Sequence, residues 1–413
     1  MITFEKYKLN NGLKVILHQD LNTPMAVVNT LYDVGARDEN EDKTGFAHLF
    51  EHLMFSGSIH IEKFDEELQK AGGESNAFTS NDITNYYENI PAQNIETALW
   101  LESDRMLSLA LTDKSLDVQK NVVIEEFKQR YLNQPYGDIW LILRPLAYEQ
   151  HPYKWATIGK NISHIENATI QDVKSFFKKY YIPSNAILCV SGNFDPAIIK
   201  EQIERYYGAI PGGIKPARLL PAELQQKTFK EKSIKRDVPA NAFYYAFNMS
   251  IRKSTEYYLG DLLSDAMGKD NSSILNIALK KELELVSEIN AFITGSIDKG
   301  LFIISGKLSE NIDFETLDKA LWQQIELIKK EGLGKSRLNA LKNKISTAKA
   351  FQEQGLLNRS MNLCFFELLG DANGINNEES IYQSIEHHNL LSFAEKILVK
   401  TNCSLLKVHK NAG

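Results

Sequence analysis

Apolar and polar positions alternate along the first residues of the chain, which is typical of strands with one buried face. Residues 2–9 and 13–18 show this pattern on either side of Asn10-Asn11-Gly12, which favours a hairpin because Asn and Gly tolerate positive φ. Residues 25–32 are apolar and β-branched and predict a third strand. Similar runs predict strands at 84–90, 185–191 and 241–251, and a strand pair within 289–308.

Other stretches place apolar residues at helical spacing. The run from Phe46 to Phe55 is apolar almost throughout and predicts a buried helix that ends at Ser56-Gly57. Residues 115–131 predict a helix that Ser115 caps. The same periodicity predicts further helices at 94–109, 196–207, 256–267 and 273–284. Helices and strands therefore share the chain, which favours an α+β fold.

The segment 211–226 is the best candidate for a linker, since three of the eleven prolines lie in it. After it the order of predicted elements starts again, which suggests an internal duplication. We expect two homologous domains, each a mainly antiparallel sheet packed against helices, that face each other across a cleft. Their predicted extents are residues 1–215 and 231–413, joined by a linker at 216–230.

Composition narrows the class of protein. The 413 residues are 43% hydrophobic and 24% charged, as in globular proteins. A net charge of −6 without a dense Lys/Arg run makes nucleic acid an unexpected partner. No window approaches the roughly 18 apolar residues of a membrane span, and no apolar signal region opens the chain. Three widely spaced cysteines suggest reduced, buried thiols, so we expect a cytoplasmic protein, or a periplasmic one whose leader has been removed.

The chemistry lies in residues 48–52, which read His-Leu-Phe-Glu-His. On a helix, His48 and His52 lie one turn apart on the same face, so both imidazoles can reach one cation. Glu51 lies next to that face and can approach a water on the metal. This order, HxxEH, inverts the commoner HExxH zinc motif. The alternative is a pair of buried histidines that carbonyl groups satisfy, although ionisable groups in so apolar a run are costly to bury without a metal or partner.

A catalytic zinc needs a third protein ligand and one open position. The predicted helix at 115–131 offers Glu125 and Glu126 beside an apolar Asn-Val-Val-Ile stretch. Either carboxylate could equally be a charge that faces solvent, and periodicity does not decide between them.

At this point the chain resembles the pitrilysin/insulinase family of inverted zincins, nearest the bacterial two-domain members and the mitochondrial processing peptidase β subunit. The resemblance covers the first ~220 residues closely and the second half in outline. It rests on GFAHLFEHLMFSGS at 45–58, GGESNAFTS at 72–80, TNYY at 84–87, NVVIEE at 121–126 and HPY at 151–153.

The resemblance implies roles for particular residues. His48, His52 and Glu126 would bind one Zn²⁺ ion, and Glu51 would be the general base. Glu126 is favoured over Glu125 because it occupies the last glutamate of the family pattern. Seven residues before it the family often carries another glutamate in the second shell of the metal, where this chain has Gln119.

The resemblance also implies a substrate and a reaction. Asn76, Ala77 and Phe78 match the exposed edge strand that binds an extended peptide as an added strand. We therefore expect a zinc-dependent endopeptidase that hydrolyses short or unfolded peptides. One alternative is a non-catalytic structural or peptide-binding subunit of the same fold, and another is a zinc amidase that acts on small substrates.

One family element is missing from the second half. Self-sufficient members carry an arginine and a tyrosine that hold the substrate carbonyl. The matching stretch, LKKELELVS at 279–287, has Lys281 and Ser287 in their places. We therefore expect this chain to be the catalytic subunit of a heterodimer, in which a homologous second subunit supplies the Arg/Tyr element, with a homodimer as the alternative. A plain alternative is that Lys281 is only a solvated helix residue.

Overall fold

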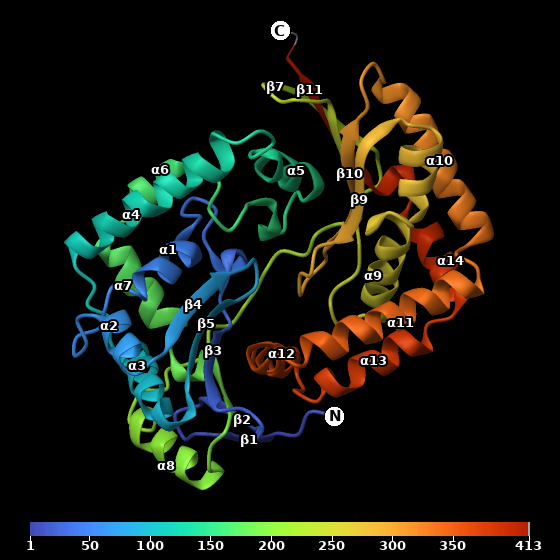
Figure 1. The fold of residues 1–413 in the computed structure, drawn as a ribbon. Helices are drawn as coiled ribbons and strands as arrows, with labels where there is room; N and C mark the ends of the chain where they lie inside the picture. The colour runs from blue at the N-terminus through green and yellow to red at the C-terminus, as the bar shows by residue number, and fades with distance from the viewer. Residues whose placement is uncertain (412–413) are drawn as a thin grey trace. The chain divides into compact units, whose positions relative to one another are not determined.

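The computed structural model describes residues 1–411, and its backbone forms two compact units (Figure 1). Neither unit is one continuous stretch of chain. The first unit comprises residues 1–128, 155–220 and 349–377, and the second comprises 129–154, 221–348 and 378 onward. The two domains predicted above, 1–215 and 231–413 with a linker at 216–230, are contiguous stretches of sequence. The two compact units of the structure group the residues differently.

The first unit contains a six-stranded sheet with the order β1-β2-β6-β3-β5-β4. Neighbouring strands are antiparallel except β2 and β6, which run parallel. The strands are β1 (Glu5–Lys8), β2 (Lys14–Gln19), β3 (Met25–Tyr32), β4 (Glu74–Thr79), β5 (Thr84–Pro91) and β6 (Ala186–Gly192).

The second unit repeats this sheet with five strands in the order β7-β11-β8-β10-β9. Just as β6 lies between β2 and β3, the last strand of this unit, β11, lies between β7 and β8, parallel to β7 and antiparallel to β8. The correspondence supports two homologous, mainly antiparallel sheets and confirms the predicted fold class. The strands are β7 (Lys230–Arg236), β8 (Ala242–Asn248), β9 (Val286–Ile293), β10 (Leu301–Leu308) and β11 (Cys403–Lys410).

Helices pack against both sheets. Those of the first unit are α1 (Phe46–Leu53), α2 (Phe64–Lys70), α3 (Ile95–Leu107), α4 (Asp113–Phe127), α6 (Ile162–Glu166), α7 (Ile170–Tyr180), α8 (Pro196–Tyr207) and α12 (Leu356–Leu369). The others are α5 (Ile139–Ala147), α9 (Thr255–Gly268), α10 (Phe314–Glu331), α11 (Lys335–Gln352), α13 (Gly374–Ser384) and α14 (His387–Ile397), with π-helical turns η3 (Lys128–Leu132) and η6 (Asn276–Glu282).

Helix α12 comes from the second half of the chain but packs on the first sheet. Leu363 and Cys364 of this helix share a buried core with Ile16, Leu31 and Ile187 of strands β2, β3 and β6. The first unit therefore has a hydrophobic core that residues 1–215 alone do not complete.

Helix α5 comes from the first half of the chain but packs on the second sheet. Its residues Ile139 and Leu143 are buried with Ala242 and Ala246 of β8 and Ile303 of β10. Each sheet is thus covered in part by a helix from the other half of the sequence.

Predicted elements agree with the observed ones where hydrophobic periodicity is strong. Strand β3 and helix α8 have the predicted limits, and residues 211–226 contain no helix or strand. The predicted cap Ser115 is wrong: Thr112 is the N-cap of α4, and its hydroxyl accepts the Ser115 N–H at 3.1 Å. Part of the predicted helix at 273–284 is the π-helical turn η6.

Two expectations from composition can be compared with the structure. Cys189, Cys364 and Cys403 are free and buried, which confirms the expected thiols. Among the described residues, no helix has the length and apolar character that crossing a membrane requires.

Candidate metal centre and peptide edge

Helix α1 carries the motif because its two faces differ. Five of its eight residues are buried, and they form the face that packs into the first unit: Phe46, Ala47, Leu49, Phe50 and Leu53. His48, Glu51 and His52 are only half-buried and share the opposite face. The predicted helix therefore holds both imidazoles and the carboxyl group at the surface of the core.

Helix α4 brings the third group. The Nε2 atoms of His48 and His52 lie 3.6 and 3.5 Å from Oε2 of Glu126. The candidate ligand atoms of the three residues all lie within 4.8 Å of one another. The two imidazole rings meet edge to face, with centroids 4.9 Å apart. In the part of the chain that the structure describes, this is the one such group of three or more His, Cys, Asp or Glu residues.

The adjacent glutamate lies in a different environment. The Glu125 side chain is 60% exposed and accepts a hydrogen bond from Lys128 at 2.7 Å, whereas that of Glu126 is 17% exposed. The structure thus brings Glu126, and not Glu125, to the two histidines.

This donor set fits zinc. Two ligand atoms at about 2.0–2.1 Å from one tetrahedral ion lie about 3.3 Å apart, close to the observed separations between the histidine nitrogens and the Glu126 oxygen. Two imidazoles and one carboxylate are a common set in catalytic zinc sites, which keep a fourth position open for water. The partial exposure of all three side chains leaves room for that position.

Glu51 lies beside the ligands without being one of this cluster. Burial raises the pKa of its carboxyl group, and hydrogen bonds from the side chain and backbone of Thr79 and the charge of His52 oppose the rise. A raised pKa brings a carboxyl group closer to the range in which it can both accept and donate a proton.

Strand β4 forms an edge of the first sheet. It pairs with β5 alone, placing Asn76, Ala77 and Phe78 opposite Tyr87, Tyr86 and Asn85. Asn76 and Phe78 are exposed, and Ala77 is half-buried. Since β4 also contacts α1, a strand added at this edge would run close to the candidate metal centre.

Three further residues from the sequence analysis have definite places. Gln119 lies on α4 and its Nε2 donates to Ser56 Oγ at 3.3 Å, just beyond α1. Lys281 is exposed on η6 and donates to the backbone carbonyl of Asn271 at 2.7 Å. Ser287 is an exposed residue of β9.

Two residues that the sequence analysis did not single out also contact the motif. Thr79 ends β4, its hydroxyl donates to the backbone carbonyl of Ala47 in α1 at 3.5 Å, and it opposes the rise in the pKa of Glu51. Glu39 accepts backbone N–H groups of Gly45 and Ala47 at the start of α1. The sequence does contain one sign that a residue such as Glu39 is needed. A helix whose N-cap is a glycine, here Gly45, has no N-cap side chain, so another residue must cap it.

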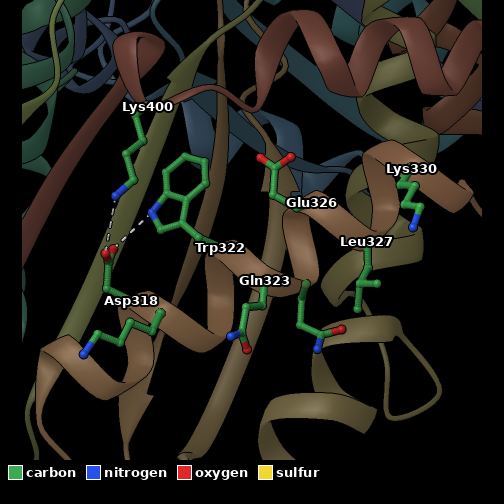
Figure 2. A pocket seen from close by; sticks show the side chains of 9 residues that line it. Asp318, Trp322, Gln323, Glu326, Leu327, Lys330 and Lys400 are labelled. Atoms are coloured by element: carbon green, nitrogen blue, oxygen red, sulfur yellow. Dashed lines mark hydrogen bonds and ion pairs between the residues drawn. The ribbon is translucent and has the colours of Figure 1, made fainter.

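A pocket lies elsewhere, along α10 of the second unit. It has a volume of about 710 Å³, and its wall includes Trp322, Leu327 and Lys330 (Figure 2). Asp318 at one end accepts a hydrogen bond from Trp322 Nε1 at 3.1 Å and faces Lys400. The pocket includes none of the residues that the sequence points to.

Comparisons with known proteins point in one direction. A family model described as insulinase (peptidase family M16) matches residues 14–136, and one described as the peptidase M16 inactive domain matches residues 167–345. The zinc protease PqqE of Helicobacter pylori is 30% identical over 344 residues, which span 82% of this chain and 77% of that protein. The mitochondrial-processing peptidase subunit beta of Saccharomyces cerevisiae is 24% identical over 359 residues, 83% and 77% of the two chains.

Solved structures show the same relationship. The crystal structure of a protease from Helicobacter pylori has a TM-score of 0.92 and 26% identity, and the match covers 100% of both chains. The crystal structure of pitrilysin has a TM-score of 0.79 at 17% identity and covers 98% of this chain and 45% of the other. The likeness to pitrilysin concerns the fold alone.

Proposed function

Since this chain belongs to the insulinase family of peptidases, peptidase family M16, we propose that it is a zinc-dependent endopeptidase that hydrolyses short or unfolded peptides. The observation that carries the proposal is the cluster of His48, His52 and Glu126 with Glu51 beside it. Relatives named as zinc proteases support the reaction class.

His48, His52 and Glu126 would hold one zinc ion. When bound, zinc supplies a Lewis acid that acidifies a water and polarises the substrate carbonyl. Glu51 accepts the proton that the attacking water loses and delivers it to the nitrogen of the leaving amine. Thr79 opposes the rise in the pKa of Glu51 and so favours the carboxylate form that accepts the proton. Gln119, through its bond to Ser56, lies near the end of the motif helix without adding a negative charge.

The substrate binds as an added strand on β4. Backbone groups of Asn76, Ala77 and Phe78 pair with an extended peptide, which accounts for a preference for unfolded substrates and a weak dependence on sequence. A folded protein cannot present such a strand.

We further propose that the chain is the catalytic subunit of a heterodimer. Lys281 and Ser287 stand where the family resemblance places an arginine and a tyrosine. A lysine lacks the planar fork of arginine, and a serine hydroxyl has a shorter reach than a phenol. A second copy of the chain would carry the same two residues, so a homologous subunit with the Arg/Tyr element is the better partner.

The test combines metal analysis with cleavage of fluorescence-quenched peptides of graded length. The wild-type chain, alone and with a homologous subunit, should contain one zinc and prefer peptides of several residues. Glu51→Gln should retain zinc and lose cleavage by about 10²–10⁴-fold. Unchanged cleavage by Glu51→Gln would refute the assigned base, and equal rates on single-residue amides would favour a small-substrate amidase. Zinc without cleavage in any combination would favour the non-catalytic subunit.

A further inference from the structure

We propose that Glu39 is a positioning residue for the metal centre: its carboxyl group fixes the first turn of α1 and thereby the imidazole of His48. The inference rests on the proposed function, since it concerns how the chain prepares the same metal site. Glu39 touches neither the metal ligands nor the edge strand in the contacts described above, so its role is exerted through the backbone.

The contacts are specific. Oε2 of Glu39 accepts the N–H of Gly45 at 2.9 Å, and Oε1 accepts the N–H of Ala47 at 2.8 Å. The first N–H groups of a helix have no partner within the helix and need an outside acceptor. Gly45, the N-cap of α1, has no side chain and a left-handed backbone with φ of 89°. A carboxyl group six residues upstream therefore does what a local cap usually does.

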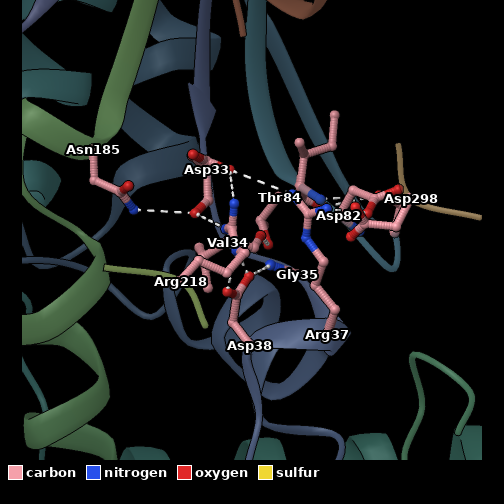
Figure 3. A network of polar contacts seen from close by, with 12 residues as sticks. Asp33, Val34, Gly35, Arg37, Asp38, Asp82, Thr84, Asn185, Arg218 and Asp298 are labelled. Carbon is pink, nitrogen blue, oxygen red and sulfur yellow. Dashed lines mark hydrogen bonds and ion pairs between the residues drawn. The ribbon is translucent and has the colours of Figure 1, made fainter. Parts of the chain in front are cut away.

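Glu39 is itself held in place. Its side chain is buried, with 8% of the residue exposed. Its neighbour Asp38 accepts the backbone N–H of Gly35 at 3.0 Å and the guanidinium of Arg218 at 2.7 Å (Figure 3). The Glu39 N–H donates to Ala36 at 3.3 Å, and Trp155 Nε1 donates to the same carbonyl at 2.9 Å. The Glu39 carboxyl group thus reaches α1 from a short loop that these hydrogen bonds hold in place.

The consequence for the metal follows from the position of His48. Ala47, which Glu39 holds, directly precedes His48, and His52 lies one turn further along the helix. A frayed or rotated first turn would move His48 relative to both His52 and Glu126. Partners that orient metal ligands typically contribute 10–100-fold to metal affinity.

The decisive measurement is the zinc dissociation constant, obtained by competition with a chromophoric chelator. Glu39→Gln keeps the size of the side chain but replaces one acceptor oxygen with an NH₂ group that faces a backbone donor. We expect its zinc affinity to fall about 10–100-fold, with circular dichroism unchanged. Glu41→Gln is the matched control: Glu41 lies two residues further on, its side chain is 46% exposed and pairs with Lys160, and its zinc affinity should equal that of the wild type.

The outcomes separate this inference from the proposed function. Wild-type protein that binds no zinc would overturn the function itself. Wild-type and Glu39→Gln proteins with equal zinc affinity would leave the function standing and overturn the positioning role. Should Glu39→Gln fail to fold, amide hydrogen exchange of the metal-free wild type decides: slow exchange at Gly45 and Ala47 supports the cap, and exchange at the rate of open amides contradicts it.

Discussion

Glu125 and Glu126 are neighbours in sequence, and the difference between their surroundings predicts different effects of the same substitution. Glu126→Gln removes a carboxylate that lies 3.5–3.6 Å from two imidazole nitrogens. Its zinc affinity should fall by about a hundredfold or more, since even indirect partners of a metal contribute 10–100-fold. Glu125→Gln should retain zinc, because Glu125 is exposed and pairs with Lys128. Zinc content after dialysis against a weak chelator measures both, and zinc loss in the Glu125 variant alone would reverse the assignment.

The raised pKa of Glu39 predicts that the stability of the folded chain depends on pH. Burial raises its pKa to about 8, against the hydrogen bonds from Gly45 and Ala47. Between about pH 4.5 and 8 the folded chain holds a proton that the unfolded chain has released, so this contribution to stability is complete below that range and is lost as pH rises through it.

The difference in unfolding free energy between metal-free wild type and Glu39→Gln should therefore fall by roughly 3 kcal/mol from pH 5 to pH 8. Urea unfolding at several pH values measures it. A difference that stays constant or grows with pH would show that Glu39 is already ionised in the folded chain at pH 5.

At this scale the sequence predicts only what is local. His48, Glu51 and His52 lie within five residues, so helical geometry is enough to place them on one face. Glu126 required a family resemblance, because 74 positions separate it from His52 and only the fold brings them together. Thr79 and Glu39 act through hydrogen bonds to another element, and neither lies in a pattern that periodicity can detect.

At the scale of elements, a partly buried ionic network holds the start of the candidate linker segment, residues 211–226, to the loop that follows β3. Arg218 contacts both Asp33 and Asp38 (Figure 3). Lys215 pairs with Asp33 at 2.7 Å. Burial alone would raise the pKa of Asp33, but the charges of Arg218 and Lys215 and their hydrogen bonds outweigh it and lower the pKa. Such a carboxylate contributes stability above its unfolded pKa of about 3.9, which is lost as pH falls through the lower folded value.

Arg218→Ala should therefore lower the free energy of unfolding by about 3 kcal/mol at pH 7, because it leaves Asp38 without its guanidinium. The deficit relative to wild type should shrink as pH falls below about 4, because the Asp33 carboxyl group, whose pKa Arg218 lowers in the wild type, becomes protonated. Arg205→Ala is the control: its pair with Glu96 is exposed and should contribute no more than about 1 kcal/mol. Equal urea midpoints for the two variants would contradict the anchoring role.

Element limits could be predicted where one signal dominates. Strand β3 is buried along nearly its whole length, and α8 begins at Pro196 after its cap Asp195, so both limits follow from the sequence. The start of α4 was displaced because Thr112 and Ser115 are both good caps. Their reciprocal hydrogen bonds place Thr112 outside the helix and Ser115 within its first turn.

At the scale of the whole chain, the order of elements along the sequence shows the duplication. It does not show that α5 packs on the second sheet and α12 on the first. The repeated strand order follows from similar runs of strands and helices in the two halves. Which sheet an amphipathic helix covers is a different question. Helices α5 and α12 each present an apolar face that either sheet could bury, and only tertiary packing assigns α12 to the first sheet and α5 to the second.

The same repeat shows where the two positions lie at which we propose that an arginine and a tyrosine are absent. Strand β9 holds the edge position in its sheet that β4 holds in the first, and it carries Ser287, while Lys281 lies on the preceding turn η6. Both side chains are exposed, so larger replacements need not disturb the core.

If a partner normally supplies an arginine and a tyrosine, the isolated chain should cleave peptides at least tenfold more slowly than the chain mixed with a homologous subunit that carries them, since one lost oxyanion contact costs about 10²–10³-fold. Lys281→Arg combined with Ser287→Tyr should raise the rate of the isolated chain, whereas Lys335→Arg, at an exposed lysine of α11, should not. Peptide cleavage at matched zinc content measures all of these rates. Full activity of the isolated wild type, unchanged by any second subunit, would show that this chain completes its own active site by another group.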